Sequence, residues 1–127
     1  MDQLKIATID PFSVSADTIE HVVALLNRVY GTAEAGMWKD GWVRTDSQEI
    51  AKLIAKEEII AAHQGSTLVG VVRLRQVADD ILEFGMLAVA PEQRSTGAGR
   101  ALLKYVESAA KEKGVPKMQL EILVPKT

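Results

Sequence analysis

A short glycine-containing segment at residues 94–99, Arg-Ser-Thr-Gly-Ala-Gly, has the composition of a phosphate-binding turn. It lies between an apolar stretch that predicts a buried strand and a stretch with helical periodicity. Backbone N–H groups at the start of a helix have no partner inside the helix, and the helix dipole favours an anion there. Gly97 and Gly99 let a ligand approach the backbone closely, while Arg100 and Lys104 add positive charge nearby. A pyrophosphate matches such a turn in size and charge.

A plainer interpretation is that the two glycines only shape a strand-to-helix turn, as they do in most sequences with an isolated Gly-x-Gly. Two familiar nucleotide motifs do not fit. A P-loop requires Gly-Lys-Ser/Thr, whereas Gly99 is followed by Arg100 and Ala101. A dinucleotide-binding fingerprint requires Gly or Ala where Leu102 stands. The segment therefore predicts neither a nucleoside triphosphate nor a nicotinamide dinucleotide as the ligand.

The composition of the 127-residue chain is that of one globular domain, with 47% hydrophobic and 25% charged residues. The formal net charge of -2 does not favour nucleic acid as a partner, because phosphate binding needs an excess of basic residues. Cysteine is absent, which excludes disulfides, thiolate zinc sites and a cysteine nucleophile. No apolar run is long enough to span a membrane, and residues 1–5 lack a basic region followed by an apolar one. We therefore expect a cytoplasmic protein with no membrane partner.

Hydrophobic periodicity predicts the elements that must position this turn. Asp17 with Glu20, and Asp46 with Glu49, form capping-box patterns at the starts of two helices. Gly114 is a predicted C-cap for a third helix. The predicted helices cover residues 17–30, 46–56 and 98–113, and the predicted strands cover residues 4–9, 59–63, 68–75, 81–89 and 118–124.

The order strand, helix, helix, three strands, helix, strand predicts an α/β (α+β) fold. Short turns join the three middle strands, which should be antiparallel, and a helical crossover makes the last strand parallel to its neighbour. A mixed, mostly antiparallel sheet with helices on both faces follows. Within the strand at residues 68–75, alternation is expected to place Leu68, Val72 and Leu74 on one face. Residues 32–44 have no clear period and are expected to form a loop or broken helix.

The string at residues 87–103, Leu-Ala-Val-Ala-Pro-Glu-Gln-Arg-Ser-Thr-Gly-Ala-Gly-Arg-Ala-Leu-Leu, resembles the coenzyme A motif of the GCN5-related N-acetyltransferases, the GNAT family. The family pattern is Leu-x-Val-x-Pro-x-x-Arg/Gln-x-x-Gly-x-Gly/Ala leading into a helix, and every fixed position is met. The order of elements also agrees over residues 4–124. The resemblance implies an acyl-CoA N-acyltransferase-like fold, with residues 1–127 forming a single domain that lacks the family's usual C-terminal helix and hairpin.

The resemblance implies acetyl-coenzyme A as the cofactor and gives the matching residues their roles. Backbone amides of the turn at residues 93–99 would hold the pyrophosphate. The backbone of Leu87 and Val89, where the strand separates from its parallel neighbour, would pair with the pantetheine arm. The Leu87 amide would also face the thioester oxygen, where a donor stabilises the charge that develops in acyl transfer. The implied coenzyme-binding residues are Leu87, Ala88, Val89, Gln93, Arg94, Ser95, Thr96, Gly97, Ala98, Gly99 and Arg100.

Glu83 is the candidate catalytic base, because attack on a thioester requires a neutral amine and amines are mostly protonated at pH 7. It lies fourteen positions before Gly97 and resembles the glutamate that several family members use at this place, often through a water. A partly apolar cleft would raise the pKa of its carboxyl group. The alternative, which weighs equally, is a glutamate that is exposed to solvent or paired with Arg73 or Arg75.

The resemblance also implies a tyrosine that protonates the departing thiolate, but in the family it belongs to a helix after the last predicted strand. The chain ends at Thr127, before that region. Tyr30 and Tyr105 lie on the apolar faces of their predicted helices and are expected to be core residues. Without the family's hairpin, the strand at residues 118–124 would be an exposed sheet edge, so one hypothesis is a homodimer through this edge. The alternative is a truncated chain.

The segment after the first predicted helix occupies the place where family members line the acceptor cleft. Glu34, Trp38 and Trp42 are therefore candidates for an acceptor pocket with an apolar wall and an acidic group suited to an ammonium. The alternative is a loop that its tryptophans anchor in the core. His21 and His63 belong to no cluster of Asp, Glu and Cys with ligand spacing, so we expect no metal site.

Two functions remain open at this point. The first is an N-acetyltransferase that moves an acetyl group from acetyl-CoA to an amine of a small molecule or peptide. The second is a module that binds acetyl-CoA or coenzyme A without transferase activity, because the family's general acid and much of its acceptor wall are missing. Release of free thiol in the presence of amines separates the two.

Overall fold

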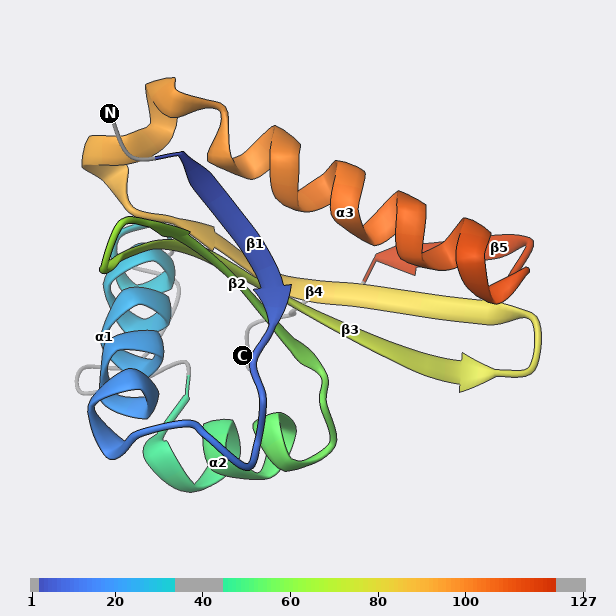
Figure 1. Ribbon diagram of the computed structural model, residues 1–127, viewed down its shortest axis with the longest axis horizontal. Coiled ribbons are helices and arrows are strands. Elements are labelled where there is room, and N and C mark those ends of the chain that lie inside the picture. Colours follow the sequence, from blue (N-terminus) through green and yellow to red (C-terminus); the bar gives the residue numbers. More distant parts are fainter. Residues whose placement is uncertain (1–2, 34–44, 121–127) are drawn as a thin grey trace, which may run out of the picture.

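The computed structural model of the protein describes residues 3–33 and 45–120 (Figure 1). Its strands are β1 (Leu4–Thr8), β2 (Ile59–Gln64), β3 (Thr67–Ala78), β4 (Ile81–Val89) and β5 (Lys117–Leu120), and its helices are α1 (Ala16–Ala33), α2 (Ser47–Ala55), the 3-10 helix η1 (Pro91–Thr96) and α3 (Ala98–Lys113). Among these residues, the five strands form one sheet in the order β1-β2-β3-β4-β5. Neighbouring strands are antiparallel, except that β4 and β5 are parallel. The predicted mixed sheet and the predicted order of elements are confirmed.

The start of one helix agrees with the sequence prediction and the start of another differs. At α2, the Asp46 side chain accepts a hydrogen bond from the Glu49 N–H at 2.8 Å, as the capping pattern predicts. At α1, the prediction that Asp17 caps the helix is wrong. The Ser15 hydroxyl accepts a hydrogen bond from the Thr18 N–H at 3.1 Å, and Asp17 falls in the first helical turn. The helix also continues past its predicted end.

The hydrophobic core forms two layers, one on each face of the sheet (Figure 1). Helices α1 and α2 cover one face, termed the α1 face, and α3 covers the other, termed the α3 face. The Val, Leu and Ile residues of the α1 face that are at most 2% exposed are Val22, Leu26, Ile50, Ile54, Ile59 and Val71. Those on the α3 face are Ile60, Val69, Val72, Leu102 and Val106. Each such side chain stabilises the fold by roughly 1.5–3 kcal/mol on burial, so the sheet is fixed from both sides.

A bulge in β3 changes the alternation that the sequence predicted. Leu68 packs on the α1 face, whereas Val72 and Leu74 pack on the α3 face, so the prediction that the three share one face is wrong. The register between β2 and β3 shifts at Ala62 and His63. An extra residue in one strand reverses which face the following side chains occupy, and this accounts for the difference.

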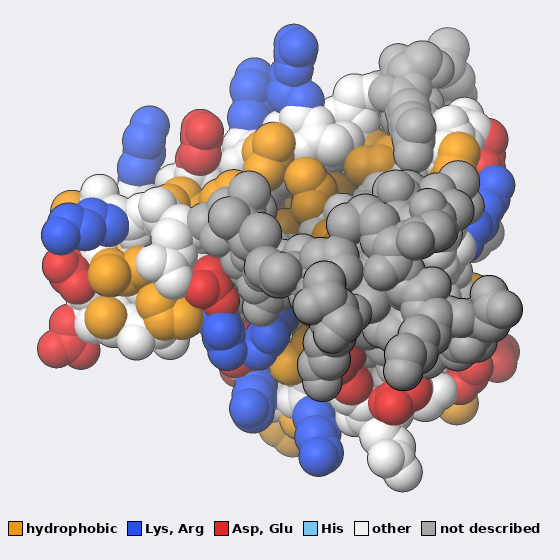
Figure 2. Space-filling model, turned by 180° about the vertical axis from the view of Figure 1, so that it is seen from behind, with side chains coloured by type: hydrophobic (Ala, Val, Ile, Leu, Met, Phe, Trp, Pro, Cys, Tyr) orange, Lys and Arg blue, Asp and Glu red, His pale blue; other side chains and the backbone are white. Residues whose placement is uncertain are grey.

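The surface of the described residues carries mixed charge. Figure 2 shows Lys and Arg side chains interspersed with Asp and Glu around the visible face, with no continuous basic stripe among the coloured side chains. Within residues 3–33 and 45–120, no helix is long and apolar enough to cross a membrane. Over the same residues, no three His, Asp or Glu side chains are grouped so that they could hold a metal ion.

Candidate functional site

The predicted phosphate-binding turn contains the end of one short helix and the start of a longer one. Pro91 begins η1, which ends at Thr96, and Gly97 links it to α3. Gly97 has a φ of 82°, in the left-handed region that glycine adopts without the steric cost of a Cβ atom. No side chain of a described residue caps α3, so its first backbone N–H groups are left for an anion or for solvent. The predicted start of the helix at Ala98 is confirmed.

Strand β4 contains a bulge that the sequence analysis did not predict. Two residues of β4, Met86 and Leu87, oppose the single residue Val72 of β3. Met86 has a φ of 50°, which is uncommon for a residue other than glycine. A bulge of this kind bends the strand and increases its twist. Gly85, directly before Met86, is the residue-type signal that could have predicted it, because a glycine inside a strand often marks a bulge.

Beyond the bulge, successive residues of β4 direct their backbone groups to opposite edges of the strand. Ala88 pairs with β3, and Ala90 donates its N–H to the carbonyl of Val69 at 2.9 Å. Leu87 and Val89 therefore direct their backbone groups away from β3. Among the described residues, β5 pairs with β4 only at residues 81–84, so Leu87 and Val89 lie past the end of that pairing. The family resemblance implies this arrangement for the pantetheine arm.

A tyrosine of α1 reaches the same stretch of β4. Tyr30 is half-buried on the α1 face, and its hydroxyl donates a hydrogen bond to the Leu87 carbonyl at 3.4 Å. The ring of Tyr30 packs against the core, as expected, but the sequence did not predict the partner of its hydroxyl. Tyr105 packs against the core of the α3 face, as expected.

Glu83 lies before the bulge, between polar partners on both neighbouring strands. Its Oε1 accepts from Arg75 Nε at 2.8 Å and lies 2.6 Å from Arg75 Nη2, and its Oε2 accepts from the Gln119 side-chain amide at 2.6 Å. The hydrogen bonds from Gln119 and then Arg75 lower the pKa of Glu83, because both favour the charged carboxylate. The expected apolar cleft with a raised pKa is therefore wrong. The alternative pairing with Arg75 is the one that the structure forms.

A second pair of the same kind lies beside the first. Arg73 donates from Nε to Glu58 Oε1 at 2.9 Å, and its Nη2 lies 2.8 Å from the same oxygen. Arg73 and Arg75 are two residues apart in β3 and so share a face of the strand. The charge of Arg73 adds slightly to the lowering of the pKa of Glu83. Two arginine–glutamate pairs thus form a polar strip along β3.

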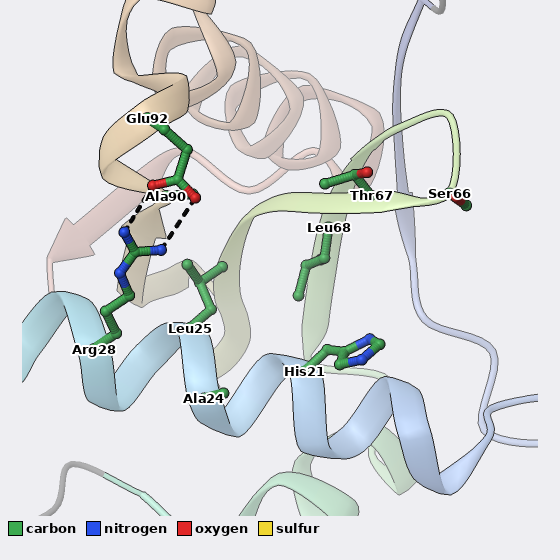
Figure 3. Close-up of a pocket in the computed structure, with 9 residues that line it drawn as sticks. All are labelled: His21, Ala24, Leu25, Arg28, Ser66, Thr67, Leu68, Ala90 and Glu92. Carbon is green, nitrogen blue, oxygen red and sulfur yellow. Dashed lines mark hydrogen bonds and ion pairs between the residues drawn. The ribbon is translucent and has the colours of Figure 1, made fainter.

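A cavity of about 400 Å³ lies between α1, the start of β3 and the end of β4 (Figure 3). It is lined by His21, Ala24, Leu25, Arg28, Ser66, Thr67, Leu68, Ala90 and Glu92. At one end of the cavity, Arg28 donates from Nη1 to Glu92 Oε1 at 3.1 Å and from Nη2 to Glu92 Oε2 at 2.8 Å. This ion pair connects α1 to η1, the first part of the phosphate-binding turn.

The predicted coenzyme-binding residues lie next to one another in space as well as in sequence. They run along the second half of β4, through η1 and into the first turn of α3: Leu87, Ala88, Val89, Gln93, Arg94, Ser95, Thr96, Gly97, Ala98, Gly99 and Arg100. The candidate acceptor residues Glu34, Trp38 and Trp42 lie outside the described residues, as does the predicted strand beyond Leu120.

Similarity to solved structures supports the fold. The PaiA N-acetyltransferase from Thermoplasma acidophilum, in complex with coenzyme A, has a TM-score of 0.74 at 21% identity, over 89% of this chain and 75% of that chain. An aminoglycoside acetyltransferase from an uncultured soil metagenomic sample, in complex with sisomicin, has a TM-score of 0.67 at 16% identity, over 94% and 78%. N-acetylglutamate synthase from Neisseria gonorrhoeae, complexed with coenzyme A and N-acetyl-glutamate, has a TM-score of 0.66 at 23% identity, over 91% of this chain and 24% of that chain.

Sequence comparison decides the family. No curated protein matches the chain significantly. A family model described as the acetyltransferase (GNAT) family matches residues 20–127, which include the whole of the β4 to α3 segment. Because this match extends over most of the sequence, and the fold agrees with it, the chain belongs to the acetyltransferase (GNAT) family.

Proposed function

We propose that this GNAT acetyltransferase moves the acetyl group of acetyl-coenzyme A to a primary amine of a small molecule or peptide. The observation that carries the proposal is the turn after β4, where Gly97 in a left-handed conformation precedes the uncapped start of α3. Two similar structures, named as an aminoglycoside acetyltransferase and an N-acetylglutamate synthase, support a small amine as the acceptor class.

The residues of the turn fit the diphosphate of coenzyme A. A Cβ atom built on Gly97 would meet nothing within 4 Å, so the space beside the turn is open to a ligand. The first N–H groups of α3 and the positive end of its dipole stabilise a negatively charged group, such as a diphosphate. Arg100, exposed in the first turn of α3, adds a positive side chain. Acetyl-coenzyme A, when bound, would supply the acetyl group as an activated thioester, and coenzyme A would leave as the free thiol.

The Leu87 N–H is the proposed donor to the thioester oxygen. It belongs to the bulge, on the edge of β4 that faces away from β3. A backbone donor held there in advance stabilises negative charge on that oxygen without reorganising during the reaction.

Glu83 is the proposed acceptor of the ammonium proton of the substrate, through an ordered water. Its lowered pKa keeps the carboxylate charged and suits it to a position near an ammonium. The same lowered pKa makes Glu83 a weak base. We therefore expect it to raise kcat by about hundredfold, at the lower end of the range for general bases. Glu34, Trp38 and Trp42, which follow α1 in the sequence, are the proposed acceptor pocket.

Two features of the protein beyond the reaction stay proposals. One is a homodimer that forms through the edge at β5, the last strand of the described sheet. Light scattering that finds only monomer at high concentration would count against it. The other is a cytoplasmic location, which fits the use of acetyl-CoA.

Two measurements on the purified chain test the proposed function. Titration calorimetry measures the affinity of the turn for coenzyme A. Release of free thiol from acetyl-CoA, tested with a panel of amines, measures acetyl transfer. We expect heat in the first measurement and amine-dependent release in the second. Folded protein that gives no heat contradicts the whole proposal. Binding without release by any amine contradicts transfer and leaves a coenzyme A-binding module.

A further inference from the structure

The hydroxyl of Tyr30 makes a contact that connects α1 to the proposed reaction centre. The ring packs in the core of the α1 face, and the hydroxyl donates to the carbonyl of Leu87, 57 positions later in the chain. At 3.4 Å this bond is longer than the usual value of about 2.7–2.8 Å between two oxygens. Hydrogen bonds in catalytic sites are often long before ligands bind and shorten in the complex.

The carbonyl that Tyr30 holds belongs to the residue whose amide is the proposed oxyanion donor. In an extended strand, the N–H and C=O of one residue point to the same edge, as the exchange of both bonds in an antiparallel pair requires. Leu87 directs both groups away from β3, so the β3 ladder does not fix them. It also follows Met86, whose φ of 50° marks an irregular backbone. The Leu87 carbonyl belongs to the peptide group after Leu87 and the N–H to the one before it, so a bond to the carbonyl restrains the N–H through the extended backbone of Leu87.

The same turn of α1 makes a second connection to this segment. Arg28, two residues before Tyr30, binds Glu92, five residues after Leu87. Helix α1 thus holds the coenzyme A motif at two points, one in the bulge and one in η1. The half-buried contact is the one at the reaction centre.

We propose that Tyr30 is a positioning residue for acetyl transfer, whose hydroxyl holds the Leu87 carbonyl and thereby aims the Leu87 amide at the thioester oxygen. The proposal rests on the proposed function and assigns a role to a side chain outside the coenzyme A motif. It concerns orientation alone: the hydroxyl proton stays on Tyr30 and no bond is broken.

The test compares Tyr30→Phe with Tyr105→Phe. Each variant removes one hydroxyl from a half-buried ring and keeps the ring in its core layer, but Tyr105 lies on the α3 face, where it lines a separate cavity with Leu74 and Leu82. For Tyr30→Phe we expect kcat to fall about tenfold at every pH, because the misdirected donor stabilises the reacting oxygen less well. The affinity for coenzyme A should not change, since the grip of the turn on the diphosphate is intact. Tyr105→Phe should leave both quantities unchanged.

A second measurement does not depend on activity. In amide NMR spectra of the ligand-free protein, Tyr30→Phe should shift the Leu87 and Ala88 resonances and Tyr105→Phe should not. If these resonances shift but the unmodified protein is inactive, the contact between Tyr30 and Leu87 is supported and the proposed function is contradicted. Unshifted resonances, or an unchanged kcat in an active protein, overturn the proposal. Loss of activity limited to one limb of the pH profile also overturns it, because that result assigns the hydroxyl to proton transfer.

Discussion

The two halves of β4 meet their surroundings in different ways. At residues 81–84 the strand has a partner on each side, and the carboxylate of Glu83 bonds a side chain from both of them, Arg75 on β3 and Gln119 on β5. From residue 85 onward, the strand and the turn after it offer backbone groups: the Leu87 amide in the bulge, and then the N–H groups of α3 that follow Gly97. The first half thus presents a charged side chain and the second half presents main-chain donors.

This difference separates two steps of the proposed reaction. The main-chain half recognises a ligand through conformation, so it should fail when a substitution disturbs φ or ψ, whatever the chemistry of the new side chain. The half around Glu83 should fail when the charge is removed, even if the backbone is untouched. Substitutions in the two halves are therefore expected to act on different measured quantities.

The largest expected effect is on turnover in Glu83→Gln. The amide keeps the size and shape of the side chain but cannot accept the proton of an ammonium, so kcat should fall about hundredfold. The affinity for coenzyme A should be the same as in the unmodified protein, because the turn is not touched. Steady-state kinetics together with calorimetry measure both quantities.

Glu58→Gln is the matched control for this substitution. Glu58 is also bonded to an arginine of β3 and is 16% exposed, against 12% for Glu83, but it lies on the opposite side of β3 from β4. Turnover should survive this change. If the two variants lose turnover equally, the loss reflects the polar strip as a whole and not proton transfer at Glu83.

The next effect in size is on coenzyme binding in Gly97→Ala. A Cβ atom at a φ of 82° costs about 1–2 kcal/mol in the left-handed region, and the chain can relieve it by turning the peptide groups that open α3. We expect the dissociation constant for coenzyme A to rise about tenfold, the equivalent of one weakened hydrogen bond to a charged group. Turnover at saturating acetyl-CoA should change much less.

Gly114→Ala controls for the strain. Gly114 caps the other end of α3 with a φ of 68°, and a Cβ atom there also meets nothing within 4 Å. The two variants should lose similar stability in thermal unfolding, while only Gly97→Ala loses affinity. Equal losses of affinity would mean that the helix as a whole, and not its first turn, holds the ligand.

The main-chain half of the site was the more predictable from sequence. Gly97 and the motif around it indicate a left-handed residue between η1 and α3, because glycine adopts positive φ more readily than other residues. The positive φ of Met86 left no such trace, since methionine is not a residue that favours it, and the only local signal of the bulge is Gly85 before it. The bulge in β3 was also missed, and with it the face of Leu68, although Gly70 stands beside the extra residue and a glycine inside a strand often marks a bulge.

Side-chain partners were predicted less well, because they depend on register and on long-range contacts. Glu83 was found by its position, but its bond to Gln119 follows from how β5 aligns with β4. The ring of Tyr30 was placed by helical spacing, whereas its hydroxyl partner is 57 residues away. Ser15 and Asp17 are both good capping residues, and only the path of the chain into α1 decides between them.

The dependence of stability on pH provides a smaller test of the half around Glu83. Because the pKa of Glu83 is lowered in the folded protein, its ionised pair stabilises the fold above the ordinary pKa of 4.5. This stabilisation is lost as the pH falls through the lowered value. The melting temperature should therefore be higher for the unmodified protein than for Glu83→Gln at pH 7, and the difference should shrink as the pH falls below 4.5. A difference that stays constant down to pH 3 would contradict the role of charge.

The smallest effect is expected at the ion pair between Arg28 and Glu92, the exposed connection of α1 to the turn. Both side chains are more than half exposed, at 54% and 56%, so water and salt screen their attraction. In a double-mutant cycle of Arg28→Gln and Glu92→Gln, the coupling in melting temperature should be small at low salt and vanish at about 1 M salt, where the screening length is about 3 Å. Coupling that persists at high salt would mean that this pair, and not only the half-buried hydroxyl of Tyr30, fixes α1 against the motif. The contrast between the two contacts is then one of burial, since screening acts on the exposed charges and leaves the half-buried hydrogen bond in place.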